Sequence, residues 1–249
     1  MIVPTPPSLS LAMSDLPRSG LDIFRLTTRL SGLVREAKQG DGHPVLTLPG
    51  YGGGDASMLA MRHFFNRIGY NSFALGLGIN FEPEEDRIRC IEDACAFREK
   101  MADKVQQRVD EIYQQTGEPV TLVGWSMGGL YAFDVAQQSP QQVRQLITLG
   151  SPFGDPRGTS MFNLMRTINR SDVPVEEQDF SLWSDKAVIK TRDVPMKIVF
   201  SQADGFVAPQ IAMLADHDCV EHIEISAAHA GFTHNPQVFS LLAELLSES

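Results

Sequence analysis

The sequence predicts an α/β fold with a mainly parallel sheet of about six strands flanked by helices. Short apolar runs alternate along the chain with longer segments that repeat apolar residues at helical spacing. This alternation is typical of strands joined by right-handed helical crossovers. The chain has 249 residues, of which 43% are hydrophobic, so it is long enough to bury one large core. We therefore expect a single domain over residues 1–249.

Each expected element rests on a local pattern. The strands are short runs rich in Val, Leu, Ile and Phe, and the helices repeat apolar residues at steps of mostly three or four. In chain order, the sequence predicts a helix at 20–38, a strand at 45–48, a helix at 58–68, a strand at 71–75, a helix at 86–115, a strand at 120–123, a helix at 127–138, strands at 143–149, 197–200 and 222–225, and a helix at 236–246. Residues 1–18 contain four prolines and are expected to form an irregular lead.

One segment interrupts the alternation. Residues 152–195 carry scattered apolar residues, and the segment is too long for an ordinary loop. It is a candidate cap or lid, because ligands of open α/β sheets bind at the carboxyl ends of the strands, which such an insertion could cover. The alternative is a pair of surface helices with a small core of their own.

Composition excludes several classes of partner. The formal net charge is −10, and binding a nucleic-acid backbone would need clustered Lys and Arg. No apolar run approaches the ~20 residues of a membrane span. The first residues lack a basic region followed by a continuous apolar stretch, so we expect no secretory signal and a cytoplasmic location. Nothing in the sequence indicates an oligomeric state.

The cysteines do not indicate a metal site. Cys90, Cys95 and Cys219 form neither a C-x-x-C pair nor zinc spacing, and no H-E-x-x-H motif occurs. We expect reduced thiols and no metal, although the sequence leaves one disulfide open.

A glycine-rich turn around Ser126 carries the main functional signal. An apolar run at 120–123 leads into Gly124-Trp-Ser-Met-Gly128, and a helical pattern follows. The G-x-S-x-G spacing suits a sharp strand-to-helix turn in which only small residues fit two positions before and after the serine. The turn exposes the hydroxyl above the sheet, beside the free N–H groups of the helix N-terminus. We expect Ser126 to be a nucleophile; the alternative is a structural serine in an ordinary βα turn.

A second glycine-rich loop follows the first expected strand. A nucleophilic serine needs N–H donors for the oxyanion of the tetrahedral intermediate, and one should be the backbone of the next residue, Met127. The other donor normally comes from the loop after an earlier strand, which here reads Pro49-Gly-Tyr-Gly-Gly-Gly54. Tyr51 N–H is the candidate. The spacing matches neither a dinucleotide-binding nor a P-loop motif.

A serine nucleophile also needs a base, held by an acid. Asp204 directly follows the expected strand at 197–200, where a carboxylate can orient a histidine. Of the six histidines, His229 comes just after the last expected strand, and His234 is the alternative. His229 is expected to remove the Ser126 proton, and Asp204 to fix its tautomer and stabilise the imidazolium.

Taken together, these residues resemble bacterial esterases and lipases of the α/β-hydrolase superfamily. The matching pieces run in the order of that family from about residue 43 onward, over roughly four-fifths of the chain; they are Leu48-Pro-Gly-Tyr-Gly, Val123-Gly-Trp-Ser-Met-Gly-Gly, Leu149-Gly-Ser-Pro-Phe, Asp204-Gly-Phe-Val and His229-Ala-Gly-Phe. The combination is specific, whereas each piece alone is not.

The resemblance implies an α/β-hydrolase fold and a serine enzyme that hydrolyses esters without a cofactor. It also favours His229 over His234 as the base. Two features depart from the family. Pro49-Gly50 replaces the common His-Gly before the oxyanion residue, and the first two strands of the full fold are not evident, which implies a reduced, six-stranded sheet.

The leading functional hypothesis is a carboxylic-ester hydrolase that works through an acyl-enzyme. Apolar residues expected near the site, Tyr51, Trp125, Met127 and Phe153, favour a small-molecule ester with an apolar acyl or alkyl group, although all four could equally be core residues. A thioesterase or an acyltransferase could use the same triad, and a non-catalytic ligand-binding protein could use the same fold.

Overall fold

The computed structural model describes residues 3–80 and 87–248, and within them one six-stranded sheet in the order β2-β1-β3-β4-β5-β6. Every pair of neighbouring strands is parallel. The strands are β1 (Pro44–Leu48), β2 (Asn71–Ala74), β3 (Val120–Trp125), β4 (Val143–Leu149), β5 (Met196–Phe200) and β6 (Val220–Glu224). The predicted α/β class and the reduced sheet are confirmed.

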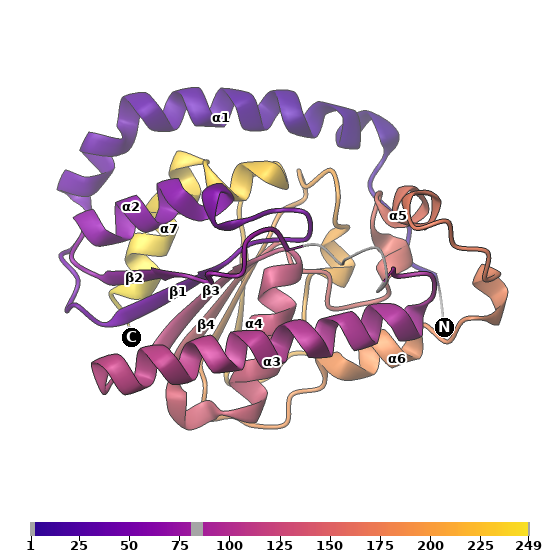
Figure 1. Cartoon of the computed structure of the whole chain (residues 1–249). Helices are drawn as coiled ribbons and strands as arrows, with labels where there is room; N and C mark the ends of the chain where they lie inside the picture. Colours follow the sequence, from indigo (N-terminus) through magenta and orange to yellow (C-terminus); the bar gives the residue numbers. More distant parts are fainter. Residues whose placement is uncertain (1–2, 81–86, 249) are drawn as a thin grey trace.

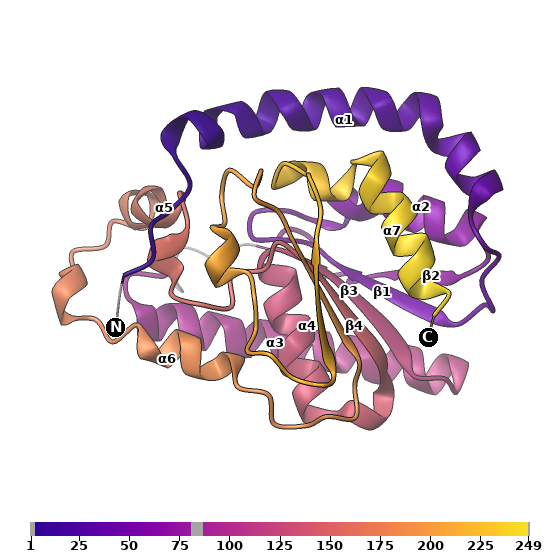
Figure 2. The same cartoon turned by 180° about the vertical axis from the view of Figure 1, so that it is seen from behind.

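Helices cover both faces of the sheet. They are α1 (Leu9–Glu36), α2 (Leu59–Arg67), α3 (Ile91–Thr116), α4 (Met127–Gln138), α5 (Phe162–Ile168), α6 (Ser181–Ser184) and α7 (Pro236–Leu246). Helices α3 and α4 lie on one face and α2 and α7 on the other, while α1 lies outside α2 and α7 (Figure 1). The view from behind shows the same layers (Figure 2).

Two large buried clusters, one on each face of the sheet, form most of the core, beside a smaller third cluster around Phe200. Strand residues alternate between them: Leu46 and Leu122 pack with α3 and α4, whereas Val45 and Val123 pack with α2 and α7. Successive side chains of a strand point to opposite faces, so a continuous apolar run such as β1 supplies both clusters. Burial on both faces stabilises the sheet, and the parallel direction of its strands places their carboxyl ends along one edge.

The expectation of an irregular lead at 1–18 is wrong over much of that segment. Helix α1 begins at Leu9, where the Ser8 hydroxyl accepts a hydrogen bond from Leu11 N at 3.3 Å, and Pro17 lies inside the helix. The side chain of Asp15 is fully buried against distant loops. These tertiary contacts outweigh the penalty for a proline within a helix. Residues 1–2 lie outside the described part of the chain.

The long helix predicted at 86–115 begins later than expected. Asp86 lies outside the described residues, Cys90 is extended, and α3 starts at Ile91. The N–H of Ile91 donates to Gln178 Oε1 at 3.0 Å, so a side chain from the 152–195 segment satisfies a free donor at this helix end.

The 152–195 segment contains α5, α6 and several short 3₁₀ turns. Phe180 and Trp183 are buried in the same cluster as α3 and α4, and Trp183 Nε1 donates to Pro152 O at 2.9 Å. The segment therefore packs onto the main core as well as onto itself.

Two further properties concern the whole described chain. None of the helices within residues 3–80 and 87–248 is both long and apolar enough to cross a membrane. Cys90, Cys95 and Cys219 are free thiols, so the disulfide that the sequence left open is absent from this structure.

Candidate active site

Ser126 lies at a strained turn between β3 and α4. Its backbone has φ 54° and ψ −124°, a conformation that residues other than glycine rarely adopt. Its N–H donates to Leu149 O at 2.9 Å, which ties the turn to the end of β4. The strand, the turn and the helix thus present the serine at the carboxyl edge of the sheet, as a nucleophile elbow does.

The glycines around Ser126 are required by close backbone contacts. A Cβ atom on Gly124 would lie 2.4 Å from Gly129 Cα, and one on Gly128 would lie 2.3 Å from Leu48 O. Real Cβ atoms essentially never approach other atoms this closely. The G-x-S-x-G spacing therefore reflects the space available at this turn.

The structure brings Ser126, His229 and Asp204 into one hydrogen-bonded chain. His229 Nε2 lies 3.0 Å from Ser126 Oγ, and His229 Nδ1 lies 2.7 Å from Asp204 Oδ2. The other carboxylate oxygen of Asp204 accepts hydrogen bonds from the N–H groups of Phe206 and Val207, at 2.7 and 2.8 Å. Asp204 and His229 are 2% and 4% exposed, so the pair is shielded from water.

Aromatic side chains surround the imidazole. The rings of Trp125 and Phe206 lie with their centroids 5.7 and 5.2 Å from that of His229. Trp125 Nε1 also donates to His229 O at 2.9 Å, so the residue before Ser126 holds the backbone of the histidine loop. The His229 ring thus packs against tilted aromatic rings, and its backbone is held by Trp125.

The charge of the site favours a protonated imidazole. Burial of the His229 ring lowers its pKa, but the charge and hydrogen bond of Asp204 and the charge of Asp15 outweigh burial and raise the pKa above its ordinary value. A base with a raised pKa accepts a proton from an alcohol more readily once it is neutral.

We expect activity to rise with pH as His229 deprotonates, because only neutral imidazole can accept the Ser126 proton. The acid limb of the kcat/KM profile should lie above the ordinary imidazole pKa of 6.5, since the pKa of His229 is raised. The measurement is kcat/KM for a p-nitrophenyl ester across the neutral range. An acid limb below the ordinary value would contradict the expectation.

The residues expected to donate to an oxyanion lie beside Ser126. Met127 is the first residue of α4, so its N–H has no acceptor within the helix. A Cβ atom on Gly50 would lie 3.0 Å from Ser126 Cβ, which places the loop that carries Tyr51 directly against Ser126. Both Tyr51 and Met127 line the same cavity as Ser126.

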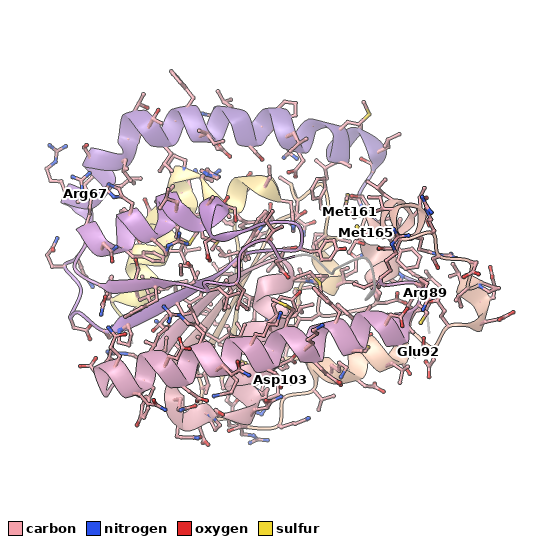
Figure 3. All side chains as sticks on the ribbon, in the orientation of Figure 1. Arg67, Arg89, Glu92, Asp103, Met161 and Met165 are labelled. Atoms are coloured by element: carbon pink, nitrogen blue, oxygen red, sulfur yellow. The ribbon has the colours of Figure 1, made fainter. Side chains whose placement is uncertain are left out.

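The cavity has a volume of about 270 Å³ and is mainly apolar. Ser126 and His229 lie in its wall, and the 152–195 segment supplies Met161, Phe162 and Met165. Figure 3 shows Met161 and Met165 between the first turns of α1 and the start of α3, on the side of Arg89. The polar side chains that also line the cavity include Arg89, Thr159, Arg166, Asn169 and Gln178.

One apolar residue expected near the site is elsewhere. Phe153 is 1% exposed and packs in the core with Phe133, at a centroid distance of 5.5 Å, whereas Tyr51, Trp125 and Met127 do line the cavity. The residue follows β4 but turns inward, because the helix-covered face of the sheet offers it full burial.

His234 is not part of the hydrogen-bonded chain. Its Nδ1 lies 2.7 Å from Thr233 Oγ1, and burial lowers its pKa. Asp15 was missed by the sequence analysis, although its carboxylate lies against the histidine loop. An isolated aspartate in a segment expected to be irregular carries no motif, so no local signal could have found it.

Among the described residues, no three His, Cys, Asp or Glu side chains lie together as a metal site would need.

Comparisons with known proteins give short sequence matches and long structural ones. A family model described as thioesterase domain matches residues 91–168. A rat (Rattus norvegicus) protein described as lysosomal phospholipase A and acyltransferase is 36% identical over 55 residues, which cover 20% of this chain and 13% of that protein. The matched part is thus a small share of the relative.

Several solved structures are similar over most of their length. A structure reported for LipS and LipT, two metagenome-derived lipolytic enzymes, has a TM-score of 0.61 at 16% identity, covering 86% of this chain and 96% of that one. The mature Bacillus licheniformis lipase BlEst2 has a TM-score of 0.58 at 17% identity, covering 85% and 94%. MGS-MChE2, an α/β-hydrolase enzyme from a lagoon-sediment metagenome, has a TM-score of 0.52 at 19% identity, covering 84% and 93%. Likeness at these identities shows a shared fold.

Proposed function

We propose that this chain, which has the α/β-hydrolase fold, is a serine hydrolase that cleaves carboxylic esters through an acyl-enzyme. Ser126 is the nucleophile, His229 the general base and Asp204 the residue that orients it. One observation carries the proposal: the chain of short contacts from Ser126 Oγ through the imidazole to Asp204, at 3.0 and 2.7 Å. An activated serine requires both contacts: one from its hydroxyl to a base, and one from that base to an acid.

The proposed reaction has two halves. Ser126 Oγ attacks the ester carbonyl carbon while His229 Nε2 takes the hydroxyl proton, and the tetrahedral intermediate then expels the alcohol, which receives that proton. Water, activated by the same imidazole, attacks the acyl-enzyme and releases the acid and free Ser126. Throughout, the Asp204 carboxylate keeps the proton on Nδ1 and stabilises the imidazolium.

The oxyanion would be held by the N–H groups of Met127 and Tyr51. The helix start at Met127 and the contact between Gly50 and Ser126 support this assignment. One such donor typically lowers the barrier by about 3 kcal/mol.

The substrate is proposed to be a small-molecule ester with an apolar acyl or alkyl group. The apolar lining of the cavity beside Ser126 supports this class. Residues 152–195 are proposed to act as a cap within a single domain spanning 1–249, because Met161, Phe162 and Met165 of that segment line the cavity. A cytoplasmic location remains part of the proposal, supported by the free thiols of all three cysteines.

A second candidate function keeps the triad and changes the substrate or acceptor. The match of residues 91–168 to a thioesterase domain, and the short match to a phospholipase and acyltransferase, favour a thioesterase or an acyltransferase as this alternative. Acyl-enzyme formation is common to all of these reactions. Comparing oxygen esters with thioesters, with and without an added alcohol acceptor, would separate them.

The proposal is tested by labelling with a fluorophosphonate probe, which reacts only with an activated serine. We expect the wild-type protein to be labelled and to hydrolyse p-nitrophenyl esters, and Ser126→Ala to lose the label and about 10⁶-fold in kcat. A series of acyl lengths would define the apolar group that the cavity accepts.

Ser139→Ala is a suitable control, because this serine follows α4 at its other end, away from the cavity lining. It should keep both label and activity. Folded wild-type protein that is neither labelled nor active would contradict the proposal and would favour a ligand-binding protein with this fold.

A further inference from the structure

The inner face of α1 carries a carboxylate that contacts two distant loops at once. Asp15 is fully buried, and its Oδ2 accepts hydrogen bonds from the N–H groups of Gly205 at 3.0 Å and His229 at 2.7 Å. Its Oδ1 accepts from Ala230 N at 3.0 Å. Three backbone donors around one ionised acceptor form a strong cluster, because each hydrogen bond is charge-assisted.

These two loops hold the acid and the base of the proposed triad. Gly205 directly follows Asp204, and His229 is itself a donor to Asp15. The carboxylate therefore joins the two loops behind the contact between His229 Nδ1 and Asp204 Oδ2. Without the carboxylate, the buried N–H groups of both loops would lose their acceptor, and the loops would keep only their other ties, such as the hydrogen bond from Ala227 N to Ser201 Oγ at 3.1 Å.

Close packing seats α1 on the acid loop. A Cβ atom on Gly205 would lie 2.7 Å from Leu11 O and 2.9 Å from Ala12 Cα, so the backbone of the helix rests on that of the loop. Helix α1 also contacts the 3₁₀ turn at Ala230–Thr233, directly after the histidine. The helix thus positions the carboxylate through its own rigid backbone.

The charge of Asp15 also acts on the imidazole. Burial lowers the pKa of His229, and Asp15 joins Asp204 in raising it. A nearby cation partly offsets this charge: Arg18 Nη2 lies 3.6 Å from Asp15 Oδ2, and the Arg18 side chain is 34% exposed. The imidazolium that forms during the reaction therefore faces one carboxylate through its ring and a second through its backbone.

We propose that Asp15 is a positioning residue for the triad, which holds the Asp204 and His229 loops in register and stabilises the imidazolium. The inference rests on the proposed serine-hydrolase function. No sequence motif around Asp15 indicates this role. The role is inferred from the position of α1, which brings Asp15 into contact with both loops.

The test compares Asp15→Asn with Asp22→Asn. Asp22 is the matched control: it is buried on the same face of α1, but it accepts from Asn235 Nδ2 and Arg25 rather than from a backbone N–H of either triad loop. Asp15→Asn should lower kcat by about 10- to 100-fold, since a small misplacement of reacting groups has effects of this size, and should change KM little. The acid limb of the kcat/KM profile of Asp15→Asn should move to lower pH, because a negative charge near the imidazole is lost.

Asp22→Asn should keep kcat within about threefold and leave the acid limb in place, although its thermal stability falls because a buried acceptor is lost. If both variants lose stability while kcat and the acid limb stay at wild-type values, Asp15 is only structural and the proposal is overturned. If Asp15→Asn does not fold, Asp15→Glu decides. It keeps the charge, so the acid limb should stay near its wild-type position, but the longer side chain would displace the two loops and kcat should fall at least about 10-fold. An unchanged kcat would overturn the proposal.

Failure of the proposed function is distinguishable from failure of this inference. Wild-type turnover and fluorophosphonate labelling are measured first. If the wild type is inactive, NMR titration of the His229 ring in wild type and Asp15→Asn still tests whether Asp15 stabilises the imidazolium. A lower ring pKa in the variant supports it, and an unchanged one refutes it.

Discussion

Replacing His229 by alanine is expected to lower kcat/KM for p-nitrophenyl esters by about 10⁴- to 10⁶-fold. Without the imidazole, Ser126 has no base within hydrogen-bond reach, because the only ring nitrogen that contacts its Oγ in the described structure is His229 Nε2, at 3.0 Å. The remaining rate would come from substrate binding and the oxyanion donors. Steady-state kinetics on several acyl lengths provides the measurement.

His234→Ala is the matched control for this prediction. His234 is five positions away and hydrogen-bonds Thr233 rather than Ser126. We expect this variant to keep kcat/KM within about threefold. Loss of activity in His234→Ala together with retention in His229→Ala would reverse the assignment of the base.

Gly128→Ala is expected to have the largest effect on stability, lowering the free energy of unfolding by about 3 kcal/mol. The new Cβ would lie 2.3 Å from Leu48 O and 2.7 Å from Pro49 O. These are backbone atoms at the end of a central strand, so they cannot move aside as a flexible side chain would. A backbone shift that relieves this clash would also displace the loop that carries Tyr51, so activity should fall together with stability.

Urea unfolding of Gly128→Ala and Gly20→Ala checks this expectation. Gly20 is an exposed position within α1, where an added Cβ meets nothing within 4 Å. Alanine there should raise the free energy of unfolding by about 0.4 to 1 kcal/mol, because it restricts the unfolded chain and favours the helix. Equal stability of the two variants would show that the turn after Ser126 has more room than its contacts indicate.

Elements with strong local signals could be predicted closely from the sequence. The predicted bounds of α4, β4 and α7 agree with Met127–Gln138, Val143–Leu149 and Pro236–Leu246. Helix α7 has a proline in its first turn and Asn235 as its N-cap, whose side chain accepts from Gln237 N. Both features are sequence signals for the start of a helix.

Elements stabilised by distant contacts could not be predicted. Burial of Asp15 holds the first turns of α1 against distant loops, and a side chain from residue 178, far along the chain, satisfies the start of α3. The short helices of residues 152–195 lack a long periodic pattern, because they are held by contacts such as Phe162 with Phe180. Periodicity over a window of the sequence contains none of this information.

The candidate site was predictable to the extent that its residues follow strands. Ser126, Asp204 and His229 each come shortly after a strand that a local pattern indicates, and parallel strands end at one edge. By contrast, Asp15 reaches the site from a helix outside the sheet layers, and the cavity-lining residues of 152–195 depend on how an irregular segment folds back.

The position of α1 ahead of all six strands has a consequence for biosynthesis. Asp15 leaves the ribosome before its partners Gly205 and His229, which follow 190 and 214 positions later. Until then the nascent helix carries a carboxylate without its backbone donors and an apolar side without α7 to pack against. Contacts of such sequence separation form slowly. Completion of the site is therefore expected to be a late event in folding, well after the central strands have paired.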